Sequence, residues 1–144
     1  MEAIKIRTVL DTNIIFAGLY SIRGASFQVL KAIIAGKIIP VLSVSLLFEY
    51  EEVLKKNSRK LCFTYGEIDA FLDNLCNLSS LQTIHYLWRP FLSDPKDDHI
   101  LELAVASQVK NITTFNAKDF KGIEKFGIKI ISPKNLLEEI KWER

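Results

Sequence analysis

Acidic side chains stand at three separate places in this chain, and their spacing suggests metal chemistry. They are Asp11, Glu49, Asp94, Asp97 and Asp98. Asp11 follows an apolar run that reads as a strand, and in open α/β sheets ligands bind outside the carboxyl ends of strands. Carboxylates that meet at one edge repel one another unless a cation neutralises them. We therefore expect a metal site where these acids come together.

Each acid also has an ordinary structural explanation when taken alone. Asp97 or Asp98 could cap a helix and oppose its dipole. One cap would suffice, however, and three carboxylates stand there. Glu49 is spaced to lie beside Leu46 and Val53, on the apolar side of its predicted helix. Burying that carboxylate is costly without a compensating cation. The set as a whole therefore favours a metal site over isolated structural roles.

An all-oxygen ligand set indicates which ion and which reaction to expect. Carboxylates suit the hard ions Mg²⁺ and Mn²⁺, whereas zinc prefers cysteine and histidine ligands. A magnesium site keeps several waters and commonly engages substrate phosphates. The chemistry that this predicts is hydrolysis of a phosphodiester by a metal-activated water.

The elements that must position these acids alternate along the chain. Strands are expected over residues 4–10, 37–42, 81–87, 111–115 and 127–131. A helix is expected over 27–35, with Gly36 as its stop. Four more helices are expected to begin after a cap at Ser43 or Ser45, after the Thr64–Glu67 capping box, after Asp94, and after Ser132 and Pro133. Alternating strands and helices predict a parallel sheet covered on both faces.

The bulk composition limits the classes of protein to consider. The 144 residues predict one domain over 1–144, and the 49% of hydrophobic residues make a homodimer an expectation. The net charge of +2 leaves nucleic-acid binding to local patches. Glu2, Lys5 and Arg7 interrupt the first apolar residues, and no apolar run spans a bilayer, so a cytoplasmic protein is expected. Cys62 and Cys76 fit no zinc spacing and are expected to be reduced.

From about Ile6 to Ser132 the chain resembles the PIN-domain ribonucleases, which include the toxins of toxin–antitoxin pairs. The resemblance rests on Asp11-Thr12-Asn13 at the end of the first strand, on Glu49 in the helix after the second strand, and on Asp94-Pro95-Lys96-Asp97-Asp98 at a helix start. It implies a three-layer α/β/α sandwich with a central parallel sheet of about five strands. It also implies a Mg²⁺- or Mn²⁺-dependent endoribonuclease, with Asp11, Glu49 and Asp98 as the acidic ligands.

The chain departs from the family pattern at its last acid. In Thr114-Phe115-Asn116, asparagine stands where the family has aspartate, so Asn116 is expected to be a weaker, uncharged fourth ligand, with Asp119 partly compensating for the missing charge. Thr12, Asn13, Asp97 and Thr114 are expected to support the ligands. The resemblance further implies an RNA substrate and an antitoxin partner.

Two other classes of function remain open on the sequence. Asn116 supports a PIN-like module that binds nucleic acid or a partner without cutting, and the basic run of Lys55, Lys56, Arg59 and Lys60 is either an RNA-phosphate contact or a solvated helix end. A phosphatase of the haloacid-dehalogenase type also has an aspartate after its first strand. That chemistry needs a second acid where this chain has Asn13.

Overall fold

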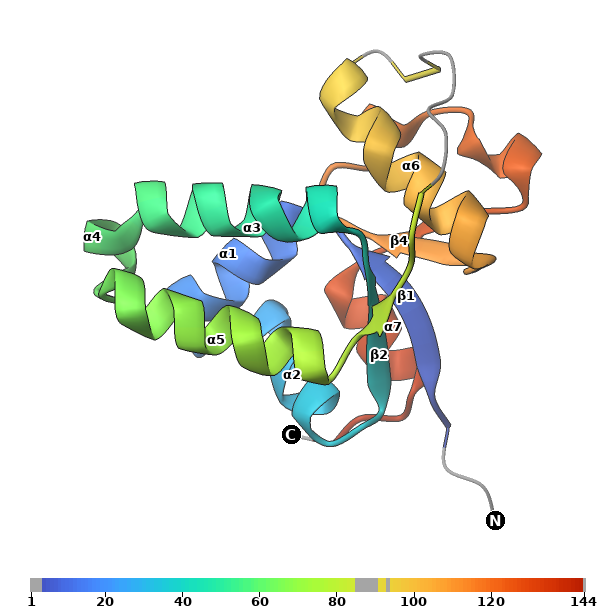
Figure 1. Ribbon diagram of the computed structural model, residues 1–144. Helices are drawn as coiled ribbons and strands as arrows, with labels where there is room; N and C mark the ends of the chain where they lie inside the picture. The colour runs from blue at the N-terminus through green and yellow to red at the C-terminus, as the bar shows by residue number, and fades with distance from the viewer. Residues whose placement is uncertain (1–3, 85–90, 93, 144) are drawn as a thin grey trace.

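Five parallel strands form the centre of the structure, a computed structural model that describes residues 4–84, 91, 92 and 94–143 (Figure 1). The strands are β1 (Ile6–Leu10), β2 (Ile38–Leu42), β3 (Ser80–Leu81), β4 (Asn111–Thr113) and β5 (Lys129–Ile131). Their order in the sheet is β3-β2-β1-β4-β5, and each neighbouring pair is parallel. The five-stranded parallel sheet expected from the sequence is therefore confirmed.

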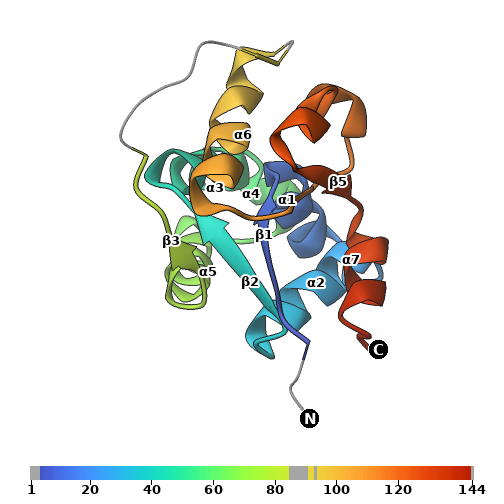
Figure 2. The same cartoon turned by 90° about the vertical axis from the view of Figure 1, so that its right-hand side faces the viewer.

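Helices cover both faces of this sheet. They are α1 (Thr12–Tyr20), α2 (Ala25–Ile34), α3 (Val44–Lys56), α4 (Ser58–Leu61), α5 (Tyr65–Asn77), α6 (Pro95–Ser107) and α7 (Pro133–Glu139), with 3₁₀ turns η1 (Ala117–Phe120) and η2 (Ile123–Phe126). Helix α6 packs across β1, β2 and β4 on one face, while α1, α2, α3, α5 and α7 pack together on the other side (Figures 1 and 2). The three-layer α/β/α sandwich is confirmed.

The strand order creates a switch point between β1 and β4. From β1 the chain builds outward through β2 to β3, then returns to the other side of β1 and builds β4 and β5. Beyond their carboxyl ends the two central strands stay joined, because the backbone N–H of Asp11 donates to the carbonyl of Thr113 at 2.9 Å. Open α/β sheets bind ligands at such a switch point. The fold therefore directs attention to the residues just after β1 and β4.

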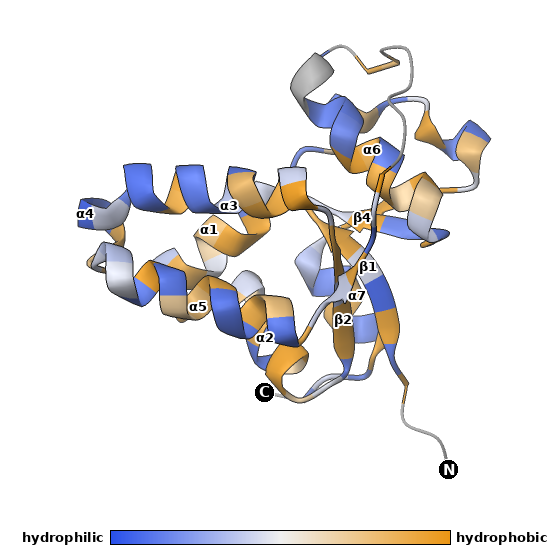
Figure 3. Ribbon diagram, in the orientation of Figure 1, coloured by the Kyte–Doolittle hydropathy of each residue, from blue (hydrophilic) through white to orange (hydrophobic). Residues whose placement is uncertain are grey.

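The core lies between the sheet and the two helix layers. Val9, Leu10 and Ile112 in the central strands are completely buried. Each such side chain contributes roughly 1.5–3 kcal/mol when it leaves water. Hydrophobic residues gather along the strands, while polar residues recur along α3 and α5 (Figure 3). The apolar runs that predicted the strands are thus the centre of the core.

Several local signals predicted the helix ends. Ser43 accepts a hydrogen bond from the N–H of Leu46 at 3.1 Å, so it is Ser43 rather than Ser45 that caps α3. The Thr64–Glu67 capping box begins α5, and α2 stops just before Gly36, whose φ is +78°.

The strand expected over 81–87 is wrong over its described part beyond Leu81. β3 is only Ser80–Leu81, and residues 82–84 form no strand. Residues 85–87 lie outside the described residues. Within the described part of the chain, no helix is long and apolar enough to cross a membrane.

Candidate active site

Asp11 is the N-cap of α1 and sits at the switch point. Its Oδ1 accepts the N–H of Thr12 at 2.8 Å, and its Oδ2 accepts the hydroxyl of Thr114, the residue after β4, at 2.7 Å. Burial raises the pKa of the Asp11 carboxyl, these two hydrogen bonds lower it, and repulsion from Glu49 and Asp119 raises it further. The carboxylate is thus fixed in orientation and close to other acids.

Glu49 reaches the same place from α3. Its helix buries Leu46, Tyr50 and Leu54 along one stripe, which turns the neighbouring Glu49 toward α1. One carboxylate oxygen accepts the hydroxyl of Thr12, and the other lies 3.0 Å from Nε2 of His99 on α6. The expectation that Glu49 faces the interior side of its helix therefore agrees with its contacts.

Asp97 joins this acidic group from the first turn of α6. Burial raises the pKa of its carboxyl to about 6, and repulsion from nearby carboxylates adds to the shift. Those carboxylates belong to Asp11, Asp94, Asp119 and Glu49. Acids from four separate segments, after β1, on α3, on α6 and on η1, are therefore close enough to repel one another.

Asp98, the next residue of α6, engages the loop before the helix. Its Oδ1 accepts the backbone N–H groups of Phe91 and Leu92 at 3.0 and 2.9 Å, and its Oδ2 is buried without a hydrogen-bond partner among the described residues. Successive residues on a helix point about 100° apart. The structure thus brings Asp97, which the sequence placed in a supporting role, next to Asp11 and Glu49, whereas Asp98 holds the loop.

Asn116 enters the site through its backbone. Its N–H donates to Oγ1 of Thr114 at 3.0 Å, which already donates to Asp11, while its side chain is exposed. Asn13 also donates from its side chain to Thr114, at 3.4 Å. The nearby charge comes from Asp119 three residues later, which repels both Asp11 and Asp97. An acid is therefore present beside Asp11 even though residue 116 is uncharged.

Two positioning residues were missed on the sequence. The buried phenol of Tyr50 donates to the carbonyl of Leu10, which ties α3 to the last residue of β1. Burial, together with repulsion from Asp11 and Glu49, raises its pKa well above the ordinary value, so it remains a neutral donor. His99, in the first turns of α6, contacts Glu49. The only sequence signal was their position, one beside Glu49 and the other beside Asp98.

The four residues of the basic run after Glu49 have different surroundings. Lys55 is engaged by Asp69 at 2.8 Å and by Glu51 at 3.1 Å, on the side that faces α5. Lys60 instead lies over the rings of Phe16 and Tyr20, 5.8 and 5.4 Å from their centroids. These two rings stack on each other at 5.6 Å along α1, the helix that starts at the site. Lys56 and Arg59 are exposed.

The donor set suits a hard cation, although the acids do not form a closed cage. Among the described residues, no three Asp, Glu, His or Cys side chains already converge as a group that would hold a metal ion. Magnesium does not need such a cage, because it is usually bound by one or two carboxylates together with water and substrate phosphates. Burial and repulsion from nearby carboxylates both disfavour the charged form of Asp97, and such an ion would stabilise that form.

Comparison with known proteins agrees with this geometry. A family model described as PIN domain matches residues 7–118, which include Asp11, Glu49 and Asp97 and end one residue before Asp119. No curated protein matches the chain. The matched region covers the sheet from β1 to β4 and most of the helices, and the family has a nuclease-type fold. The chain belongs to the PIN domain family.

Proposed function

We propose that this protein is a Mg²⁺- or Mn²⁺-dependent ribonuclease that hydrolyses RNA phosphodiester bonds, with Asp11, Glu49, Asp97 and Asp119 as the acidic set. The observation that carries the proposal is that carboxylates from four segments lie near one switch point: burial raises the pKa of Asp97 to about 6, and repulsion from Asp11, Glu49 and Asp119 adds to the shift. We infer that Asp97 takes the ligand role that the sequence suggested for Asp98.

Each of these side chains has a separate role at the carboxyl edge of the sheet. Asp11 is held in one orientation by Thr12 and Thr114, so its carboxylate is arranged before substrate arrives. His99 holds Glu49. When bound, Mg²⁺ or Mn²⁺ would neutralise the carboxylates and lower the pKa of a water for attack on phosphorus. Asn116, whose backbone N–H donates to Thr114, has an exposed side chain with an uncharged oxygen.

Aromatic side chains on α1 and basic side chains on the adjoining helices support single-stranded RNA as the substrate. The stacked rings of Phe16 and Tyr20 lie one and two helical turns beyond the site, and Tyr20 is 54% exposed. Bases stack on such rings without sequence preference, while nearby cations track the phosphates. Lys56, Arg59 and Lys60 follow on the adjoining helices.

Endonucleolytic action, a toxin role with an antitoxin partner, and a homodimer are further parts of the proposal. Large apolar side chains on the surface support a protein partner, among them Ile22, Ile34, Val44 and Leu81, which are 68–73% exposed. A second copy or an antitoxin would remove these groups from water.

The testing experiment uses a labelled single-stranded RNA incubated with the full chain. Cleavage is expected with Mn²⁺, none with EDTA, and none with Asp97→Asn. The matched control is Asp73→Asn, which neutralises an exposed aspartate on α5. If the two variants cut equally well, Asp97 is outside the site. If the parent binds RNA but never cuts it, the protein is a binding module, an alternative favoured by the uncharged Asn116.

A further inference from the structure

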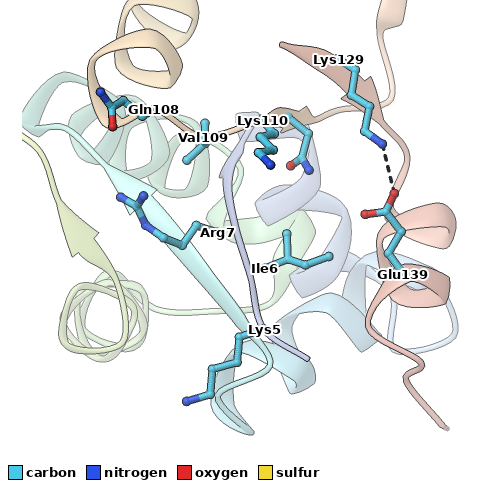
Figure 4. Close-up of a pocket in the computed structure, with 9 residues that line it drawn as sticks. Lys5, Ile6, Arg7, Gln108, Val109, Lys110, Lys129 and Glu139 are labelled. Atoms are coloured by element: carbon cyan, nitrogen blue, oxygen red, sulfur yellow. Dashed lines mark hydrogen bonds and ion pairs between the residues drawn. The ribbon is translucent and has the colours of Figure 1, made fainter. Parts of the chain in front are cut away.

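A pocket of about 370 Å³ lies at the amino edge of the sheet, at the other end of β1 from Asp11 (Figure 4). Neighbouring strands supply its lining at their starts: Arg7 in β1, Lys110 just before β4, and Lys129 in β5. The volume falls at the lower end of the range for small-molecule sites. The candidate active site uses none of these residues.

The lining is strongly cationic. Among the described residues it contains Lys5, Arg7, Lys110 and Lys129 against a single carboxylate, Glu139. The whole chain has a net charge of only +2, so this concentration is local. Such a patch at a hollow surface attracts anions.

Two of the four cations are already partly engaged. Lys129 Nζ lies 3.2 Å from Oε1 of Glu139, as the dashed line in Figure 4 marks. One nitrogen of Arg7 donates to the carbonyl of Ser107 at 3.1 Å, which caps the end of α6. A guanidinium has five N–H donors in all. Arg7 therefore keeps donors for a ligand, and Lys110 has no ion-pair partner within 4 Å among the described residues.

Asn111 gives the second, independent observation. It lines the pocket, the residue is only 5% exposed, and its Oδ1 is buried without a hydrogen-bond partner among the described residues. Buried polar atoms in folded proteins almost always have a partner. A ligand with a hydrogen-bond donor would supply one. The pocket is therefore suited to a molecule that has both an anionic group and a donor.

We propose that this pocket binds a nucleotide, with its phosphate on Arg7 and Lys110 and a base or sugar donor on Asn111. The nucleotide is either a free mononucleotide or one unit of an RNA chain. Arg7 lines the pocket and Asp11 follows it by four residues, a separation of roughly 13 Å along β1. A mononucleotide in the pocket therefore does not reach the acidic edge, and the proposal does not depend on the proposed nuclease activity.

The test is a titration of the full chain with adenosine monophosphate in EDTA, followed by NMR and calorimetry. Lys110→Gln is expected to weaken binding about tenfold, which corresponds to one charge-assisted contact. Glu139→Gln should tighten binding, because it removes the carboxylate and releases Lys129. Lys31→Gln, at an exposed lysine on α2, changes the net charge as Lys110→Gln does and should leave the affinity unchanged.

Several results would overturn the proposal. They are the absence of saturable binding, equal affinities for Lys110→Gln and Lys31→Gln, equal binding of adenosine and adenosine monophosphate, and loss of binding in Asp11→Asn. The last would place the nucleotide at the acidic edge.

A competition experiment identifies the source of the nucleotide. Single-stranded RNA that displaces adenosine monophosphate from the parent but not from Lys110→Gln points to the RNA chain. Saturable binding of the mononucleotide without such competition points to the free nucleotide. A protein that cuts no RNA but binds the mononucleotide as described would refute the proposed function and leave this inference standing.

Discussion

The two edges of one sheet carry opposite charges, and they hold them differently. At the carboxyl edge, Asp11 and Glu49 are each fixed by hydrogen bonds from other elements. At the amino edge, Lys5 and Lys110 are exposed residues that immediately precede β1 and β4. Carboxylates that are held in place by hydrogen bonds and lie close together are suited to a reaction that needs fixed geometry. Exposed cations are suited to binding an anion. The contrast suggests that one edge reacts and the other binds.

The strongest test of this contrast replaces one residue at each end of β1. Asp11→Asn is expected to lower RNA cleavage at least about 10²- to 10³-fold, because it removes a charge fixed where charge develops during reaction. Arg7→Gln should leave cleavage of a short RNA unchanged. Single-turnover rates with Mn²⁺ measure both.

Metal-free melting provides the control for that comparison. Asp11→Asn should melt at the same temperature as the parent or higher, since burial and neighbouring acids disfavour the charged form. A variant that melts markedly lower would show that Asp11 is structural and would refute the assignment.

The second test separates two adjacent aspartates. Asp98→Ala should cost about 2 kcal/mol of unfolding free energy in urea, because two backbone N–H groups lose a charged acceptor. Asp97→Asn should abolish cleavage while stabilising the metal-free protein. If Asp98→Asn, which keeps an acceptor oxygen, abolishes cleavage and Asp97→Asn does not, the two roles are reversed.

The pH dependence of metal-free stability tests the crowding at Asp97. Its folded-state pKa of about 6 exceeds the ordinary 3.8, so the folded protein binds this proton more tightly than the unfolded chain does. The resulting stabilisation is complete below about pH 4 and is lost as the pH rises through 6. Because the group is partly exposed, solvent screening reduces it to about 1 kcal/mol. Urea unfolding from pH 4 to 7 should show a larger fall in the parent than in Asp97→Asn, in which Asp11, whose pKa is also raised, still titrates.

A smaller effect is expected from Asn116→Asp. Its exposed side chain would add charge beside Asp11, and exposed charge pairs contribute at most ~1 kcal/mol, so Mn²⁺ should bind about threefold more tightly. Both forms should bind Mn²⁺ more tightly than Mg²⁺ and should cut RNA faster with Mn²⁺. Calorimetric titration with Mn²⁺ measures the affinity of both forms. If the variant has the same metal affinity, the same cleavage rate and the same metal-free melting temperature as the parent, Asn116 lies outside the site.

The smallest effect is expected when two lysines of the basic run are substituted separately and RNA binding is compared. Lys60→Ala should weaken binding of single-stranded RNA and reduce its salt slope by about 1. Lys55→Ala should leave the slope unchanged, because Lys55 is engaged by Asp69 and Glu51. Equal slopes for the two variants would mean that the run is only a solvated helix end.

Local signals in the sequence predicted much of the fold. The capping box at Thr64 and the Gly36 stop depend on a few neighbouring residues, so both could be recognised without the structure. Helix α1 was not predicted. Its first turns contain Ile14 and Ile15, β-branched residues that fit strands as well as helices, and Gly18 follows them.

The candidate site was predictable as a region but not atom by atom. Asp11 stands out because a strand ends there, and Glu49 because of its apolar neighbours. The choice between Asp97 and Asp98 depends on which way α6 is rotated against the sheet, a tertiary property that local spacing does not encode. The hydrogen bonds of Tyr50 and His99 likewise join elements far apart in the chain.

The hydrogen bond from Thr114 to Asp11 has a consequence for the timing of synthesis. The two residues are 103 positions apart, and ribosomes add roughly 5–20 residues per second. Asp11 therefore leaves the ribosome roughly 5–20 s before the residue that orients it. Until β4 pairs with β1, the growing chain contains some of the acids but no assembled site. The proposed nuclease would therefore mature only after most of its own chain had been translated, which would delay its action on RNA near the ribosome that makes it.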